Sequence, residues 1–194
     1  MPSFASLNLS PAMLANLSAL GYAEPTAIQA ASVPVILAGR DVLAQAKTGS
    51  GKTAAFGIGL MEGLALDGGG VQALVLCPTR ELATQVAGEL RRVARFQPNI
   101  KVVTVTGGVP LRRQERSLSH PAHVVVGTPG RVQKLLARGT LALDGARTLV
   151  LDEADRMLDM GFIDQIRAIV RHVPRARQTL CFSATLPEGV QQLA

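Results

Sequence analysis

The side chains best suited to chemistry are a lysine and a threonine, Lys52 and Thr53, and two carboxylates, Asp152 and Glu153. Lys52 and Thr53 end a stretch of small and polar residues that contains two glycines. Glycines let backbone N–H groups turn inward around phosphate oxygens, a lysine ammonium can reach the β and γ phosphates of a nucleotide, and a threonine hydroxyl can ligate Mg²⁺. The stretch therefore predicts a phosphate-binding loop, with an unliganded Gly/Ser/Thr-rich turn as the alternative. Its members are Ala46, Lys47, Thr48, Gly49, Ser50, Gly51, Lys52 and Thr53.

The two carboxylates follow a short apolar run, residues 148–151, that is expected to be a buried strand. Asp152 is suited to holding Mg²⁺ through water, and Glu153 to polarising the water that attacks a γ phosphate. The alternative is a solvated helix start, because Asp and Glu favour first turns. A strand-end carboxylate that accompanies a phosphate loop favours the first interpretation.

Short apolar runs alternate with amphipathic stretches along most of the chain, and the runs are rich in β-branched residues. This pattern predicts an α/β fold, a doubly wound and mainly parallel sheet with helices on both faces. In such sheets ligands bind outside the carboxyl ends of the strands, where the phosphate loop and the carboxylates are expected. The expected strands are residues 42–46, 73–77, 102–105, 123–126, 148–151 and 179–182, and expected helices start at Ser10–Pro11, near Thr26 and after the phosphate loop, over 54–64.

Composition narrows the class of protein. The chain has 194 residues and a formal charge of +6, and hydrophobic residues make up 47%, which fits one compact domain and excludes a disordered chain. No apolar run approaches the roughly 20 residues that cross a bilayer, and the two cysteines, Cys77 and Cys181, lie in apolar runs, so we expect reduced thiols and a cytoplasmic protein without membrane contact. The basic surplus lies in residues 98–194, where it suits either a polyanionic partner or simple solubility.

Several motifs in order along the chain resemble those of the DEAD-box RNA helicases, in the first RecA-like domain of that family. The string DEAD at 152–155 follows the phosphate loop, and the resemblance spans essentially the whole chain. Residues 21–29 resemble the Q motif, 78–83 motif Ia, 107–108 the GG element, 128–131 motif Ib and 183–185 motif III. Residues 72–95 and 155–162 are most similar to bacterial members that act in ribosome assembly.

The resemblance implies ATP and Mg²⁺ as cofactors, with Lys52, Asp152 and Glu153 as catalytic residues and Thr53 and Asp152 as metal ligands. It implies that Gln29 reads adenine through its amide, which has one acceptor and two donors, and that the ring of Tyr22 stacks on the base. For Gln29 the alternative is a glutamine exposed at the surface. For Tyr22 and Phe4 it is hydrophobic anchoring of the N-terminal helix. The Q-motif side of the implied cofactor site consists of Phe4, Tyr22, Glu24, Thr26 and Gln29.

The same resemblance implies RNA binding through the backbone and coupling of the two sites. The implied RNA contacts are Pro78, Thr79, Arg80, Gly107, Gly108, Thr128, Pro129, Gly130 and Arg131, and the coupling residues are Asp155, Ser183 and Thr185. Arginines neutralise phosphates, glycines allow close approach and helix starts bind anions, so these contacts read no base sequence. Turns with helix caps are the alternative for each motif taken alone. Arg112, Arg113 and Arg116 extend the basic surface or, as the favoured interpretation, form a solvated helix face.

Nothing after residue 185 resembles motifs IV to VI of the family. We therefore expect residues 1–194 to be a single N-terminal RecA-like domain, with a helical Q-motif segment at 1–40 and a phosphate-loop core at 41–194. The second RecA-like domain and any C-terminal RNA-binding module are expected to be absent. The expected function is ATP-dependent RNA unwinding, with ribosomal RNA as partner. One alternative is a nucleotide- and RNA-binding module without turnover. Another is a phosphate-loop kinase or transport ATPase, but neither of these classes explains the sequence of residues 78–83.

Overall fold

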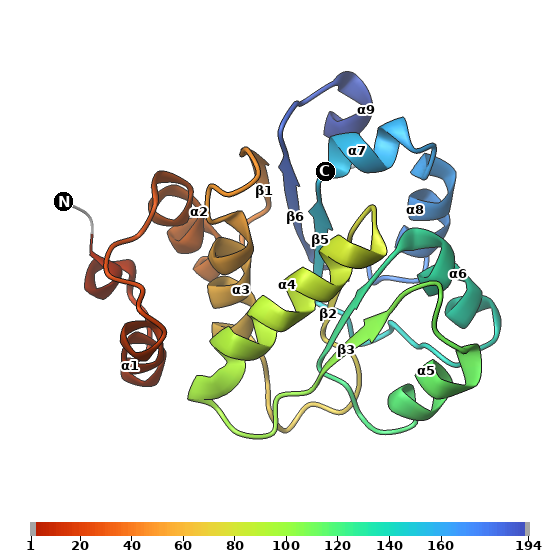
Figure 1. Ribbon diagram of the computed structural model, residues 1–194, viewed down its shortest axis with the longest axis horizontal. Helices are drawn as coiled ribbons and strands as arrows, with labels where there is room; N and C mark the ends of the chain where they lie inside the picture. Colours follow the sequence, from red (N-terminus) through yellow and green to blue (C-terminus); the bar gives the residue numbers. More distant parts are fainter. Residues whose placement is uncertain (1–2, 193–194) are drawn as a thin grey trace.

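A computed structural model describes residues 3–192 and contains one parallel sheet of six strands (Figure 1). Neighbouring strands follow the order β1-β6-β5-β2-β4-β3, and every pair is parallel. The strands are β1 (Val42–Gln45), β2 (Ala73–Leu76), β3 (Val102–Val105), β4 (Val124–Gly127), β5 (Thr148–Asp152) and β6 (Gln178–Ser183). All six predicted strands are confirmed, with ends that shift by a residue or so.

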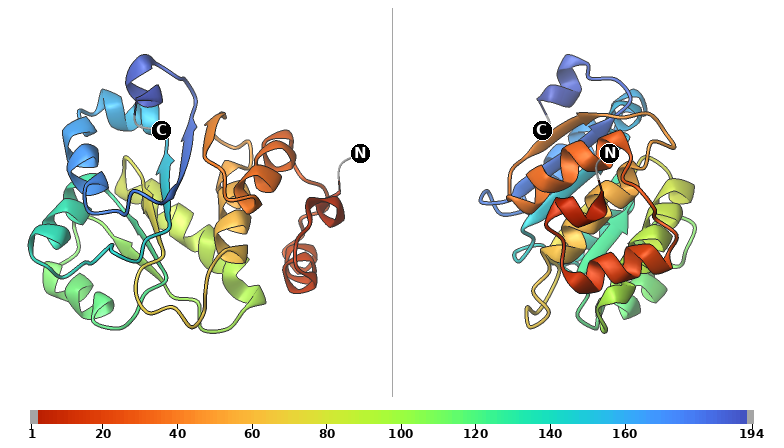
Figure 2. Two further views of the ribbon diagram at one scale, coloured as in Figure 1. Left: turned by 180° about the vertical axis from the view of Figure 1, so that it is seen from behind. Right: turned by 90° about the vertical axis from the view of Figure 1, so that its left-hand side faces the viewer.

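Helices cover both faces of the sheet, as a doubly wound fold requires (Figure 2). One face carries η1 (Phe4–Leu7), α1 (Pro11–Ala19), α2 (Ala27–Leu37), α3 (Lys52–Glu62), α4 (Arg80–Val93) and η2 (Ala94–Phe96). The other carries α5 (Leu111–Leu118), α6 (Pro129–Ala137), α7 (Ala154–Asp159), α8 (Ile163–Val170) and α9 (Glu188–Gln191). Two apolar cores result, one on each side of the central strands, and the predicted fold class is confirmed.

Local sequence signals explain where the first helices begin. Ser10 caps α1 by accepting a hydrogen bond from the amide of Met13, and Pro11 occupies the first turn, where its missing N–H costs nothing. Thr26 and Gln29 form a reciprocal capping box at the start of α2. Gly39 follows α2 with φ 71°, a left-handed conformation that glycine adopts without strain.

The segment ahead of β1 packs on the phosphate-loop helix. α2 contacts α3 extensively, and the carboxylate of Glu62 accepts hydrogen bonds from the amide and hydroxyl of Ser10 at 2.9 and 2.8 Å. Of the expected domain range 1–194, residues 1–2 and 193–194 lie outside the described part. Within residues 3–192, no helix has the length and apolar character needed to cross a bilayer.

Candidate functional site

The phosphate loop connects β1 to α3 at the carboxyl edge of the sheet. Gly49 and Gly51 have φ of 81° and 89°, which fits glycine at the two points where the loop turns. α3 begins at Lys52, so the loop ends on a helix N-terminus with unpaired amides. The Lys52 ammonium lies 2.8 Å from Oδ1 of Asp152, because β1 and β5 flank β6 and end at the same edge. The structure therefore brings the loop and the acidic strand end together.

Asp152 is fully buried at the end of β5, and its Oδ2 has no hydrogen-bond partner among the described residues. Burial raises the pKa of this carboxyl, although the nearby Lys52 ammonium acts in the opposite direction. Burial, and then the charge of Asp152, raises the pKa of the neighbouring Cys77 thiol well above its usual value. A buried carboxylate with a free oxygen is a suitable ligand for a hard divalent cation.

Glu153 stands at the turn between β5 and α7 in a left-handed conformation, with φ 55°. For a non-glycine residue this backbone conformation is strained, and it is characteristic of functional turns. Oε1 of Glu153 lies 3.5 Å from the Lys52 ammonium and 3.4 Å from the Thr48 hydroxyl. The carboxylate therefore faces the phosphate loop, where a water that attacks a phosphate would need a base.

An open groove of about 280 Å³ lies beside the loop. It is bounded by α3, by one side of α4 and by the Q-motif segment. Its lining residues are Tyr22, Gln29, Thr48, Gly49, Gly51, Lys52, Thr53, Ala54, Leu82, Gln85, Glu89 and Glu153. Seven of the predicted cofactor-site residues thus share one groove with Glu153.

Gln29 is buried and links the Q motif to the phosphate loop. Its Oε1 accepts a hydrogen bond from the Thr26 amide at 2.9 Å, and its Nε2 donates to the carbonyl of Gly51 at 3.1 Å. A Cβ at Gly51 would lie 2.6 Å from Nε2 of Gln29, so only glycine allows this approach. The amide retains one donor and one acceptor position for another partner.

Tyr22 is held in the groove by two neighbours. Its hydroxyl donates a hydrogen bond to Glu89 on α4, and Phe4 packs edge-on against its ring at a centroid distance of 6.1 Å. Burial, reinforced by the Glu89 carboxylate, raises the pKa of Tyr22 to about 12. Phe4 is buried behind Tyr22 and does not line the groove, and Glu24 is exposed outside it. Neither residue belongs to the groove lining, and their place in the cofactor site stays a prediction.

A second groove, of about 530 Å³, runs along the carboxyl ends of β2, β4 and β3. Most of the predicted RNA-contact residues line it, whereas Gly108 and Pro129 do not. Its lining residues are Pro78, Thr79, Arg80, Glu81, Gly107, Thr128, Gly130, Arg131, Lys134, Met160, Phe162 and Gln165. Residues of motif Ia, the GG element and motif Ib therefore lie along one rim of the sheet.

Arg80 lies across the glycine pair at the end of β3. A Cβ at Gly107 would be 3.1 Å from Nε of Arg80, and one at Gly108, where φ is 77°, would collide with its guanidinium. The glycines thus leave room for this side chain. Arg131, in contrast, is turned inward: its Nη1 donates to the Val109 carbonyl at 2.9 Å and to Oε1 of Gln114 at 2.8 Å. It braces the loop before α5 and retains only part of its donor capacity for a ligand.

The predicted coupling residues contact one another. Both the amide and the hydroxyl of Thr185 donate to Oδ2 of Asp155 at 3.0 Å, and the Asp155 amide donates to the Ser183 hydroxyl at 2.9 Å. Burial alone would raise the pKa of Asp155, but hydrogen bonds from Ser183 and Thr185 outweigh it and hold the pKa below its usual value. This network joins the end of β6 to the start of α7.

Sequence reasoning missed the residues that helices contribute to the two grooves. Gln85 and Glu89 follow Leu82 along α4 at helical spacing, which could have indicated a polar stripe beside the phosphate loop. Lys134 and Gln165 come from α6 and α8, and Gln165 Oε1 is buried without a hydrogen-bond partner. No local signal indicates that α8 would reach the start of α6.

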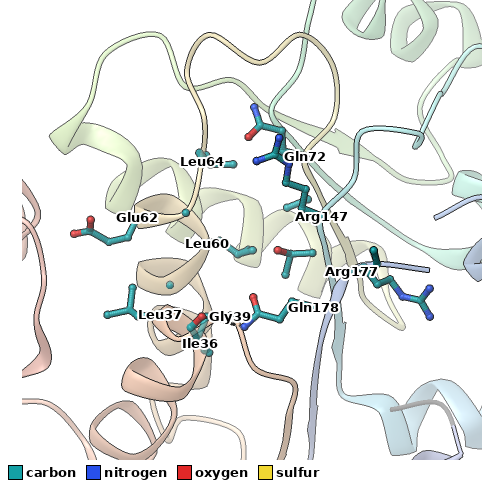
Figure 3. Close-up of a pocket in the computed structure, with 15 residues that line it drawn as sticks. Ile36, Leu37, Gly39, Leu60, Glu62, Leu64, Gln72, Arg147, Arg177 and Gln178 are labelled. Carbon is teal, nitrogen blue, oxygen red and sulfur yellow. Dashed lines mark hydrogen bonds between the residues drawn. The ribbon is translucent and has the colours of Figure 1, made fainter. Parts of the chain in front are cut away.

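A larger cavity, of about 610 Å³, lies at the opposite edge of the sheet, between α2, α3 and the amino ends of β2, β5 and β6 (Figure 3). Its amide side chains are engaged by the protein itself. Gln178 donates to the carbonyls of Ile36 and Arg40, and Gln72 bonds both backbone groups of Ala65. These two amides therefore serve the fold, and both grooves described above lie at the carboxyl edge of the sheet.

Comparison with known proteins agrees with this geometry. The family model described as DEAD/DEAH box helicase matches residues 26–193. The chain is 57% identical over its whole length to the ATP-dependent RNA helicase DbpA of Escherichia coli and 47% identical to the DEAD-box ATP-dependent RNA helicase CshA of Geobacillus kaustophilus. It covers 43% and 41% of those proteins, so it spans less than half the length of the curated relatives it matches.

The fold is similar to that of a DEAD box protein from the hyperthermophile Methanococcus jannaschii, with a TM-score of 0.95 and 40% identity over the whole of this chain and 53% of the other. The 57% identity to a bacterial relative confirms the resemblance to bacterial members, and the fold match confirms a RecA-like domain of the DEAD-box type. With the ordered motifs gathered at one sheet edge, the chain belongs to the DEAD/DEAH box helicase family.

Proposed function

We propose that this chain is the ATP-binding, N-terminal RecA-like domain of an ATP-dependent RNA helicase. It binds ATP beside the phosphate loop, grips an RNA backbone along the second groove, and hydrolyses ATP together with a second RecA-like domain. The observation that carries the proposal is the contact of Lys52 with Asp152, at 2.8 Å, beside a groove that also holds Gln29 and Glu153.

The residues present fit a magnesium ion as part of the ATP complex. Asp152 offers a buried, unpartnered Oδ2 next to Lys52, and Thr53, which carries a hydroxyl, lines the groove beside the phosphate loop. When bound, Mg²⁺ would neutralise charge on the phosphate oxygens. Lys52 supplies a positive charge to the same oxygens, and the loop amides supply hydrogen bonds.

The remaining roles fall to other side chains of the chain. Glu153, held at the strained turn, accepts a proton from the attacking water. Gln29 uses its free donor and acceptor positions on the adenine edge, and Tyr22 offers its ring for stacking. The turn between β5 and α7 is linked to the end of β6 by hydrogen bonds of Asp155 with Ser183 and Thr185. Through this link, a change at the bound nucleotide alters the RNA groove.

The curated relatives named above support two finer parts of the proposal. Their greater length supports a second domain, which we expect to contribute an arginine finger worth roughly 10³ to 10⁵ in rate. The 57% identity to DbpA supports the placement among bacterial members of the family, and from that placement we propose a role on ribosomal RNA in ribosome assembly in the cytoplasm. The second candidate function is a nucleotide- and RNA-binding module without turnover, for which the two grooves of this chain would suffice.

ATP hydrolysis with and without RNA, measured on this chain and on a protein that carries both domains, separates the candidates. We expect little turnover from the chain alone and RNA-stimulated turnover from the two-domain protein. Glu153→Gln in the two-domain protein should keep ATP binding and reduce turnover by about 10²- to 10⁴-fold. Lys52→Ala should weaken Mg²⁺-ATP binding, whereas Lys101→Ala, far from the groove, should not. RNA-stimulated turnover at full rate by the isolated chain would contradict the two-domain mechanism.

A further inference from the structure

The helix α5 is attached directly to the groove that lines the ends of β2, β4 and β3. Gln114 is buried, donates to the Thr106 carbonyl at 2.8 Å and accepts from Arg131 of the groove at 2.8 Å. Arg131 also holds the Val109 carbonyl just before the helix. The first turn of α5 is therefore fixed to the glycine loop by hydrogen bonds, so that side chains on this helix have a defined position relative to the groove.

Three arginines of α5 are exposed: Arg112, Arg113 and Arg116. Within residues 3–192, none of their guanidinium groups has an ion pair or a hydrogen bond. The one acidic residue of the helix, Glu115, is paired with Arg138 at 2.7 Å and so does not neutralise them. The outer surface of α5 therefore carries three uncompensated positive charges.

Two of these arginines lie where helix physics disfavours them. Arg112 and Arg113 occupy the first turn of α5, which has no acidic residue and no side-chain cap. The positive end of the helix dipole lies there, so a cation is less stable than an anion at this position. These two arginines therefore do not stabilise α5 itself, whereas an anionic ligand bound to them would explain their position.

The strand order indicates which ligand would reach them. β2, β4 and β3 follow one another to the edge of the sheet, so the track along their carboxyl ends leads to the end of β3 and then to α5 (Figure 1). Building on the proposed function, we propose that the RNA backbone continues past the glycine loop onto the exposed face of α5. Arg112, Arg113 and Arg116 then neutralise phosphates beyond those held in the groove, and they contact no bases.

The test compares two triple variants of this chain that lose the same charge. Arg112→Gln/Arg113→Gln/Arg116→Gln removes the α5 arginines, and Arg40→Gln/Arg171→Gln/Arg175→Gln removes three exposed arginines near the amino ends of β1 and β6. Binding of a ladder of single-stranded oligouridines of increasing length is measured by fluorescence anisotropy over a range of salt concentrations. ATP binding by each variant checks that the fold is intact.

We expect the α5 variant to bind the longer oligouridines about tenfold less tightly than the unmodified chain. The slope of log K against log salt should decrease in magnitude by up to about 2, because each lost phosphate contact on a single strand removes about 0.7. The shortest oligouridines that bind should be unaffected, and the control variant should behave as the unmodified chain. Equal losses in both variants, or no length-dependent loss in the α5 variant, would overturn the proposal. An unmodified chain that binds ATP but no RNA would instead remove the proposed function and this extension with it.

Discussion

Lys52 and Asp152 form a buried ion pair between the phosphate loop and β5, with Nζ 2.8 Å from Oδ1. Side chains of both residues are almost completely removed from solvent, so each charge depends on the other for neutralisation. A nucleotide that draws the ammonium to its phosphates would leave the carboxylate unpaired unless a second cation arrives. The pair therefore explains why Mg²⁺ and ATP are expected to bind together at this site.

This dependence predicts a stability effect without any ligand. Lys52→Met should lower the free energy of unfolding by about 3–5 kcal/mol at neutral pH, because it leaves a buried carboxylate without a partner. Lys52→Met/Asp152→Asn should recover most of the loss, since no charge is then buried. Urea unfolding of the two variants measures the difference, and a double variant no more stable than the single one would contradict the ion-pair interpretation.

The sign of the pH dependence follows from burial. Burial raises the pKa of Asp152 in the folded state above its unfolded value near 3.8. As the pH falls, Asp152 is therefore protonated in the folded Lys52→Met protein at a higher pH than in the unfolded chain. The penalty of the single variant is therefore fully present above the raised pKa and decreases as the pH falls towards 3.8. A penalty that stays constant over this range would indicate lost packing in place of a buried charge.

Gln29 has a prediction of its own because its amide already makes two internal hydrogen bonds. Gln29→Ala removes both the link to Gly51 and the free positions expected to read adenine. We expect ATP affinity to fall by roughly tenfold, since a lost hydrogen bond costs about 0.5–1.5 kcal/mol and a buried partner is left unpaired. GTP affinity should fall less, and competition titrations with both nucleotides measure the ratio. An unchanged ratio would remove the adenine-reading role.

The sheet and the strand-end residues were predictable because each depends on a local pattern. Thr148–Asp152 is an apolar run that ends in a carboxylate, and the glycines of the phosphate loop occur where the loop turns. Parallel topology then brings these ends to one edge. The contributions of α4 were not predictable in this way, because Glu89 reaches Tyr22 only through packing of segments 67 residues apart. The inward turn of Arg131 likewise depends on Gln114, which its own motif does not contain.

The contact between Tyr22 and Glu89 predicts a positioning effect on nucleotide binding. Glu89→Ala leaves the tyrosine hydroxyl without its hydrogen-bond partner, so we expect ATP and ADP affinities to fall together by about threefold to tenfold, as for the loss of one hydrogen bond worth about 0.5–1.5 kcal/mol. Glu89→Gln should restore most of the affinity, because an amide oxygen also accepts from the hydroxyl. Glu81→Gln, on the same helix but in the other groove, is the matched control. Equal affinities for the alanine variant and the unmodified chain would contradict the positioning role.

The network around Asp155 predicts an acid-sensitive link between the two sites. Because hydrogen bonds hold the pKa of Asp155 below its usual value despite burial, the link contributes stability that is fully present above the unfolded value and is lost as the pH falls through the folded one. The amide proton of Thr185, followed by NMR, should report this as a resonance that moves upfield in acid with a midpoint below 3.8. Asp155→Asn should remove the titration altogether.

Thr185→Val, which keeps the backbone donor but loses the hydroxyl, should move the midpoint towards the usual value, because one of the bonds that stabilise the carboxylate is gone. A midpoint at or above 3.8 in the unmodified chain would show that burial outweighs the hydrogen bonds.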